Sequence, residues 1–253
     1  MGDTLAWRSF SYWMRRYRHT WRGTIVISVA NPFLFLLAMG AGLGGLVDQN
    51  HSAYLHGIPY LDFFAPGLLA AAAMQTAVTE SARPVHTAGQ PSGSYRAAAA
   101  TPLRPDDIFA GHLLFIAFRI AISAAAFVLV MALFGIPGSA LLLVPAALLT
   151  GLAFAVPIAA WAVGVDRPAK LNAFFRFVVM PLYMFSGTFF PTSQLPAWLR
   201  PVVELSPLWH GVALCRTIAL GTGTPYVHVV YLAVLAALGV LAGRRRYRRH
   251  LHA

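Results

Sequence analysis

The residues of this 253-residue chain that could do chemistry are chiefly its arginines and histidines. A P-loop for nucleotide phosphates, G-x-x-x-x-G-K followed by Ser or Thr, requires a lysine, but the single lysine, Lys170, follows Asp-Arg-Pro-Ala. The chain has no H-E-x-x-H and no G-x-S-x-G pattern, and no two of its nine histidines stand at metal-ligand spacing on one helix. We therefore expect no catalytic residue, metal site or bound cofactor, and no ATP hydrolysis by the P-loop route.

Arg119 is the clearest candidate for a functional residue, because it lies well inside a long apolar run. An arginine at the centre of a bilayer costs about 3 kcal/mol on insertion scales, so it must face protein or water. One interpretation is a cation that lines a path and attracts an anionic group of a substrate. The other is a structural pair with a carboxylate such as Glu80, or a side chain that reaches an interface. Glu204 and His210 allow the same two interpretations.

The composition predicts that these residues belong to an all-α integral membrane protein. Hydrophobic residues make up 58% of the chain and charged residues 11%, and the mean hydropathy is +0.65. A soluble domain keeps roughly 25% charged residues to hydrate its surface. Basic residues outnumber acidic ones by 19 to 8, but they stand beside apolar runs, so we expect membrane lipid as a partner and no nucleic acid.

Six apolar runs predict six transmembrane helices, because about 20 residues cross a bilayer as a helix. They are residues 24–47, 61–78, 108–134, 141–165, 171–190 and 226–242. We expect one membrane domain over residues 1–253. The first 22 residues mix aromatic residues with arginines, so no cleavable signal peptide is expected there.

The distribution of basic residues predicts that both ends of the chain are cytoplasmic. Fifteen of the 19 basic residues fall in the segments that would share one side, whereas only Arg200 and Arg216 fall on the other. Because cytoplasmic loops carry the excess of arginine and lysine, the first side is expected to face the cytoplasm. The fifteen are Arg8, Arg15, Arg16, Arg18, Arg22, Arg83, Arg96, Arg104, Arg167, Lys170, Arg244, Arg245, Arg246, Arg248 and Arg249.

Residues 1–23 predict a basic amphipathic helix that lies in the membrane interface. On a helical wheel Arg15 and Arg16 lie away from the large apolar residues. A plain basic anchor that only sets the topology is the alternative. The apolar residues share one face: Trp7, Phe10, Met14, Tyr17 and Trp21.

Residues 80–107 form the longest predicted cytoplasmic connection. Ser94, Tyr95 and Arg96 precede four alanines and predict a short helix, which Thr101 and the following prolines must end. Pro105 suits the first turn of the next helix, where the two aspartates after it favour the positive helix end. The short helix is either a docking element for another subunit or an ordinary connector.

Residues 187–223 are apolar but hold four prolines, so no continuous span fits them. Ser206 followed by Pro207 predicts a helix start, and Gly221 predicts its end after Leu220. A helix of this length covers about 21 Å at ~1.5 Å per residue, which is short of a full crossing. Together with the shorter apolar piece before it, this segment predicts an outer re-entrant hairpin.

At this point the chain resembles the permease of type-2 ATP-binding-cassette (ABC) exporters. The closest match lies in residues 186–199 (SGTFFPTSQLPAWL) and 206–211 (SPLWHG), with a further match at residues 99–103 (AATPL). These stretches are similar to permeases of nodulation lipo-oligosaccharide exporters and of antibiotic-resistance exporters, and the likeness covers essentially the whole chain. Residues 83–94, with Pro84, Gly89, Pro91 and Gly93, look less helical than the family's loop.

The resemblance implies a half-transporter that exports an amphipathic substrate, such as an antibiotic or a lipid-linked glycan, across the inner (plasma) membrane. Two permease subunits, identical or paralogous, would pair, and two copies of a separate ATPase would bind ATP and Mg²⁺. ATPase motion would pass through the residues around the short loop helix: Ser94, Tyr95, Arg96 and Thr101. The interfacial helix, with Trp7, Arg15, Arg16 and Trp21, would move as a lever.

The resemblance also proposes residues for the substrate path or its gating: Glu80, Arg119, Phe189, Glu204 and His210. Aromatic side chains either line such a path or pack against lipid: Phe174, Phe175, Tyr183 and Phe189. A stand-alone secondary transporter or channel is the alternative, although the spans lack the paired carboxylates that proton or sodium cycles use. An intramembrane enzyme or a scaffold is a third interpretation.

Overall fold

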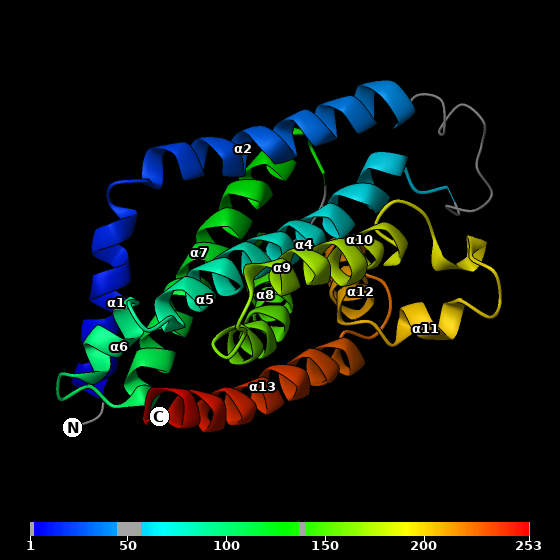
Figure 1. Cartoon of the computed structure of the whole chain (residues 1–253). Helices are drawn as coiled ribbons and strands as arrows, with labels where there is room; N and C mark the ends of the chain where they lie inside the picture. Colours follow the sequence, from blue (N-terminus) through cyan, green and yellow to red (C-terminus); the bar gives the residue numbers. More distant parts are fainter. Residues whose placement is uncertain (1–2, 45–56, 137–139, 253) are drawn as a thin grey trace.

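The computed structural model describes residues 3–44, 57–136 and 140–252, and all regular structure among these residues is helical. Four long helices form the bundle: α4 (Tyr60–Ser81), α7 (Pro105–Leu133), α8 (Ala140–Ala162) and α13 (Tyr226–His252). Helix α8 packs against the other three, and α4 lies at the centre with most of its residues buried (Figure 1). Many of these buried residues are alanines, so neighbouring helices approach α4 closely.

By length and apolar composition, four described helices suit a membrane crossing: Tyr60–Gly89, Pro105–Leu133, Leu141–Ala162 and Tyr226–Leu251. These helices agree with the predicted spans 61–78, 108–134, 141–165 and 226–242, although three are longer than predicted. Helix α13 continues ten residues beyond Ala242, so the arginines of the predicted tail stand on the helix itself. The described chain is therefore built around at least four helices that fit a bilayer.

The two other predicted spans are interrupted in the structure. Helix α2 (Trp21–Ala38) contains Pro32 and passes into the π-helical turn η1 (Met39–Gly44); its apolar stretch is Val29–Ala38. Residues 45–47 of the predicted first span lie outside the described residues. The predicted span 171–190 consists of α9 (Pro168–Phe174), the π-helical turn η3 (Phe175–Val179) and α10 (Met180–Phe185). It ends at Phe185, five residues before the predicted end.

The predicted interfacial helix is shorter than expected. Helix α1 (Asp3–Tyr17) ends in a turn at residues 18–20, and Trp21 is the first residue of α2, so Trp21 does not belong to α1. A helical wheel assumes one continuous helix, so it cannot show this break, which depends on how α1 and α2 pack against α7. Helix α1 packs along the first half of α7, where the hydroxyl of Ser9 donates to the carbonyl of Ile108 over 3.3 Å. Gly111 permits this approach, since an added Cβ would lie 2.4 Å from Cβ of Ser9.

The connection between α4 and α7 is more helical than the sequence indicates. Helix α5 (Arg83–Gly89) follows α4 almost directly, although residues 83–94 look poorly helical. Pro84 stands in the first turn of α5, where a backbone N–H has no partner within the helix. The missing N–H of proline therefore costs nothing there, and Pro84 begins the helix rather than preventing it. The predicted short helix is confirmed as α6 (Ser94–Ala99), and α7 begins at Pro105 as predicted. The amide of Arg104 donates to the Asp107 carboxylate over 3.1 Å and fixes this start.

The segment before α13 contains the 3-10 turn η4 (Thr192–Gln194), α11 (Arg200–Glu204) and α12 (Pro207–Leu220). Helix α12 confirms the predicted bounds. Its start is capped by the hydroxyl of Ser206, which accepts from the amide of Trp209 over 3.1 Å. Its end is Gly221, whose φ of +66° is a left-handed conformation that suits glycine.

The helices divide the molecule into two ends (Figure 1). One end carries α1, α5, α6 and the last turns of α13, and we call it the basic end because of its arginines. The other end carries α11 and the first turns of α4 and α13. Contacts confirm that α5 and the last turns of α13 lie together, since Nε2 of His250 lies 3.0 Å from the carbonyl oxygen of Gly89. Gly89 also lies against the end of α8, where an added Cβ would be 3.1 Å from the carbonyl oxygen of Val163.

Candidate functional site

Arg119 is held by partners from two other helices. Its Nε donates to Oε1 of Glu80 over 2.9 Å, and its Nη1 donates to the hydroxyl of Tyr17 over 2.9 Å. The guanidinium carbon also lies 4.5 Å from the ring centre of Tyr17. The side chain of Arg119 is 6% exposed and that of Glu80 is 19% exposed. The structure therefore brings together two predicted site residues and adds Tyr17, and the cluster joins α1, α4 and α7.

Two cavities share Glu80 and Arg119 in their walls. The larger has a volume of about 540 Å³ and lies among α2, α4, α7 and α10; we call it the central cavity. The smaller has about 240 Å³ and is lined by Tyr17, Arg16 and Thr20 beside the ion pair. The pair thus stands where the two cavities meet. A rearrangement of these three side chains would change the wall of both.

The lining of the central cavity suits a molecule with polar and apolar parts. Amide and hydroxyl groups come from Asn31, Gln75 and Thr76, and apolar area comes from Phe35 and Phe127. Pockets for amphipathic molecules combine mostly apolar walls with a few placed polar groups. Tyr183, a predicted path residue, also lines this cavity.

A second cluster ties α6 to the bundle at the basic end. The hydroxyl of buried Tyr95 is hydrogen-bonded to Nδ1 of His112 and lies 3.3 Å from the hydroxyl of Tyr247. The ring of Trp13 stacks on His112 with centres 3.7 Å apart. Burial, followed by the neighbouring Tyr247, raises the pKa of Tyr95 well above its ordinary value, so its hydroxyl keeps its proton. Tyr95 therefore joins α6 to α1, α7 and α13.

The other predicted coupling residues lie at the surface of the same end. Thr101 is exposed, and its hydroxyl donates to the carbonyl of Ala98 over 2.6 Å, which closes the last turn of α6. Ser94 and Arg96 are half-buried at the start of this helix. Arg248 of α13 pairs with Asp106 of α7. The sequence analysis missed His112 and Tyr247, because no local pattern distinguishes a histidine or tyrosine that meets a distant helix.

Arg216 is the main polar anchor of the opposite end, whereas the sequence predicts only on which side of the membrane it lies. Its Nε donates to the carbonyl of Phe63 over 2.9 Å, and its Nη2 donates to the carbonyl of Gly187 over 2.7 Å. A third bond reaches the carbonyl of Thr188 over 3.2 Å. Because a buried cation needs partners, these carbonyls hold the segment after α10 against α4. Gly67 leaves room, since an added Cβ would lie 2.9 Å from Nη2.

Three predicted site residues lie away from the Arg119 cluster. Phe189 is half-buried and packs between Phe64 and Tyr183, with ring centres 5.7 Å and 5.3 Å away. His210 is buried, and its Nδ1 lies 2.9 Å from Nδ1 of His228. Glu204 is exposed at the end of α11, and within the described ranges no ion pair involves it. These residues form no common site with Glu80 and Arg119.

Comparison with known proteins identifies the family. The model of the ABC-2 type transporter family matches residues 4–220, which is most of the chain. The chain belongs to the ABC-2 type transporter family. Similar curated proteins include nodulation protein J of Sinorhizobium fredii, 30% identical over 92% of this chain and 89% of that protein. Nodulation protein J of Rhizobium meliloti is 29% identical over 93% of this chain and 90% of that protein. Nodulation protein J of Rhizobium leguminosarum bv. trifolii is 30% identical over 98% of this chain and 96% of that protein.

Membership of the ABC-2 family fits the helices and the motifs. The family model describes a membrane permease, and the four apolar helices give this chain the character of a multi-pass membrane protein. The family match and the likeness to nodulation protein J identify this ABC-2 chain as the membrane subunit of an ABC exporter, and the family implies an ATPase partner. The likeness to nodulation protein J confirms the predicted branch of the family.

Proposed function

We propose that this ABC-2 permease exports an amphipathic molecule, such as a drug or a lipid-linked glycan, when a separate ATPase hydrolyses ATP. The observation that carries the proposal is the Arg119 cluster, whose ion pair stands in the wall of two cavities. The central cavity combines amide groups with aromatic side chains, as an amphipathic cargo requires.

The proposed assembly follows the family. Two permease subunits, identical or paralogous, pair in the inner membrane, and two ATPase copies bind ATP and Mg²⁺ at the basic end. Six spans cross the bilayer: the four long helices, α2 with η1, and the run from α9 to α10. The segment 187–223 is the outer re-entrant hairpin, and both chain ends face the cytoplasm. The excess of arginine at the basic end supports this orientation.

The proposed mechanism uses the two clusters in sequence. ATPase closure moves α6 through its exposed surface around Thr101. Tyr95 passes the displacement to α7 through His112 and to α1 through Trp13. Tyr17 is the last residue of α1, and it contacts Arg119 through its ring and through its hydroxyl oxygen, which accepts from Nη1 of Arg119. Movement of α1 therefore weakens this contact. The wall between the two cavities then opens.

Reconstitution tests the proposal. The purified permease is placed in proteoliposomes with an ABC ATPase subunit that it binds, and ATP-dependent movement of fluorescent amphiphiles is measured. We expect transport that Arg119→Gln lowers at least tenfold, while Arg200→Gln, which changes an exposed arginine of α11 at the opposite end, leaves it within twofold. Absence of ATP-dependent transport with a bound ATPase would refute the proposal. Transport by the chain alone, driven by an ion gradient, would replace it with a secondary transporter or channel.

A further inference from the structure

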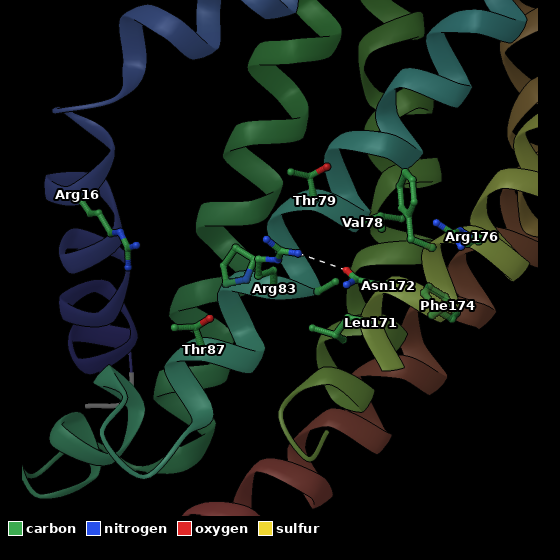
Figure 2. A pocket seen from close by; sticks show the side chains of 12 residues that line it. Arg16, Val78, Thr79, Arg83, Thr87, Leu171, Asn172, Phe174 and Arg176 are labelled. Carbon is green, nitrogen blue, oxygen red and sulfur yellow. Dashed lines mark hydrogen bonds between the residues drawn. The ribbon is translucent and has the colours of Figure 1, made fainter. Parts of the chain in front are cut away.

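A third cavity adjoins the two that share the ion pair: Thr79 also lines the central cavity, and Arg16 and Pro84 also line the smaller one. It has a volume of about 790 Å³ and is bounded by α1, by the junction of α4 and α5, and by the run from α9 to η3 (Figure 2). Three arginines line it: Arg16 of α1, Arg83 of α5 and Arg176 of η3. We call it the arginine cavity. Neither Glu80 nor Arg119 belongs to its lining.

The three arginines of this cavity carry charge that the protein does not balance. Ion pairs in the described ranges join Arg119 with Glu80, Lys170 with Asp166 and Arg248 with Asp106, and none includes the three. Arg83 instead donates from Nη2 to Oδ1 of Asn172 over 3.3 Å, which aims its guanidinium across the cavity (Figure 2). A cavity with three cations and no carboxylate in its lining selects for an anion.

Arg176 lies inside an apolar helical run, and its side chain is exposed. It lies eight residues after the start of α9, which is about 12 Å along the helix at ~1.5 Å per residue. An arginine so far into an apolar helix is costly unless it pairs or faces a polar space. It also stands in the π-helical turn η3, and such turns inside α-helices occur frequently at functional sites.

Apart from Thr79, Thr87 and Asn172, the rest of the lining is apolar, and it continues onto an exposed face. Val78, Leu171, Phe174 and Phe175 complete the cavity wall. Beyond it, Phe177 is 72% exposed on the same helical run. The arginines lie near the end of α4, and the apolar surface lies next to them. This arrangement matches the two parts of an anionic phospholipid, a phosphate headgroup and an acyl chain.

We propose that the arginine cavity binds an anionic phospholipid of the leaflet at the basic end. Its phosphate contacts Arg83, which lies between Arg16 and Arg176, and one acyl chain lies over Phe174 and Phe175 (Figure 2). Guanidinium groups favour phosphate because their planar donors meet two oxygens at once. The proposal takes from the proposed function only the placement of the basic end at a membrane surface. The bound lipid need not be transported.

Lipid selectivity measured by electron paramagnetic resonance tests this site. The full chain is reconstituted in phosphatidylcholine vesicles that contain a trace of spin-labelled phosphatidylglycerol or spin-labelled phosphatidylcholine. We expect the wild type to hold the phosphatidylglycerol probe at least threefold more strongly than the phosphatidylcholine probe. Arg83→Gln with Arg176→Gln should reduce this ratio by at least half. The matched control, Arg245→Gln with Arg249→Gln, removes two exposed charges of α13 and should change it by less than a fifth.

Each other outcome overturns the site. Equal loss in both double variants shows a diffuse charge effect, and removal of the preference by equimolar sn-glycerol 3-phosphate shows a site for soluble phosphate. If the glutamine pair does not fold, Arg83→Ala against Arg245→Ala gives the same comparison, because Arg83 is exposed. The assay contains no ATPase and no ATP, so its failure leaves the transport proposal standing, and a failure of transport leaves lipid binding measurable.

Discussion

Arg119 of α7 and Glu80 of α4 lie 39 residues apart in the chain, yet Nε of Arg119 donates to Oε1 of Glu80 over 2.9 Å. Removing one partner leaves a mostly buried charge unpaired, which costs about 3 kcal/mol or more, whereas removing both leaves none. We expect Arg119→Gln and Glu80→Gln each to lower the unfolding temperature in detergent. The double variant should lose less than the two single losses added together. Additive losses in a double-mutant cycle would show that the two side chains do not interact.

Tyr95→Phe removes the hydroxyl that joins α6 to His112 and Tyr247 while keeping the ring. The loss of a buried hydrogen bond costs about 1 kcal/mol, and Nδ1 of His112 is left unpaired. We expect a small fall in the unfolding temperature but a large fall in substrate-stimulated ATPase activity with the partner bound. Tyr12→Phe is the control, since Tyr12 is 43% exposed. Full stimulation in Tyr95→Phe would place the coupling contact elsewhere.

Gly211→Ala tests the packing of α12 against α8. Alanine inside a helix is normally favoured over glycine by about 1 kcal/mol. Here the added Cβ would lie 2.3 Å from Cγ2 of Thr150, and overpacking costs about 1–3 kcal/mol, so we expect net destabilisation. Thr150→Ala in the same chain should restore stability. Gly23→Ala, which meets no atom within 4 Å, should be neutral or stabilising by thermal unfolding. Stabilisation by Gly211→Ala alone is the contrary result.

Arg216→Lys keeps a positive charge but loses the planar fork that reaches Phe63 and Gly187 together. We expect a loss of about 2 kcal/mol and faster amide hydrogen exchange across residues 187–206. Arg200→Lys should affect exchange less, because Arg200 bonds only to carbonyls of its own segment, at Ser193 and Leu195. Unchanged exchange in Arg216→Lys would mean that packing alone holds this segment.

Local signals in the sequence predicted several elements to the residue. Ser206 and Gly221 mark the ends of α12, because a capping hydroxyl and a left-handed glycine act within one turn of the chain. Pro105 marks the start of α7 for the same reason. Pro84 is compatible with two outcomes, since a proline either interrupts a helix or begins one, and the flanking residues do not decide which.

Contacts between segments that are distant in the sequence are harder to predict from the sequence. Glu80 was named as one possible partner of Arg119, because both are charges near the same apolar runs. Tyr17 was placed only on an apolar face, since nothing near it in sequence indicates that α1 passes Arg119. The three carbonyl partners of Arg216 are backbone atoms, which no residue pattern identifies. The side chains that complete these sites are defined by how the helices pack.

Helix α13 runs without interruption from Tyr226 to His252. Near its start, Tyr231 stacks on His210 and donates to the carbonyl of Leu205; near its end, Tyr247 meets Tyr95. Sixteen residues at ~1.5 Å separate these contacts by about 24 Å of continuous helix. The helix thus connects the basic end, where an ATPase would bind, with the opposite end of the molecule. A tilt imposed at one end must reappear as a displacement at the other, without any relay of side chains between them.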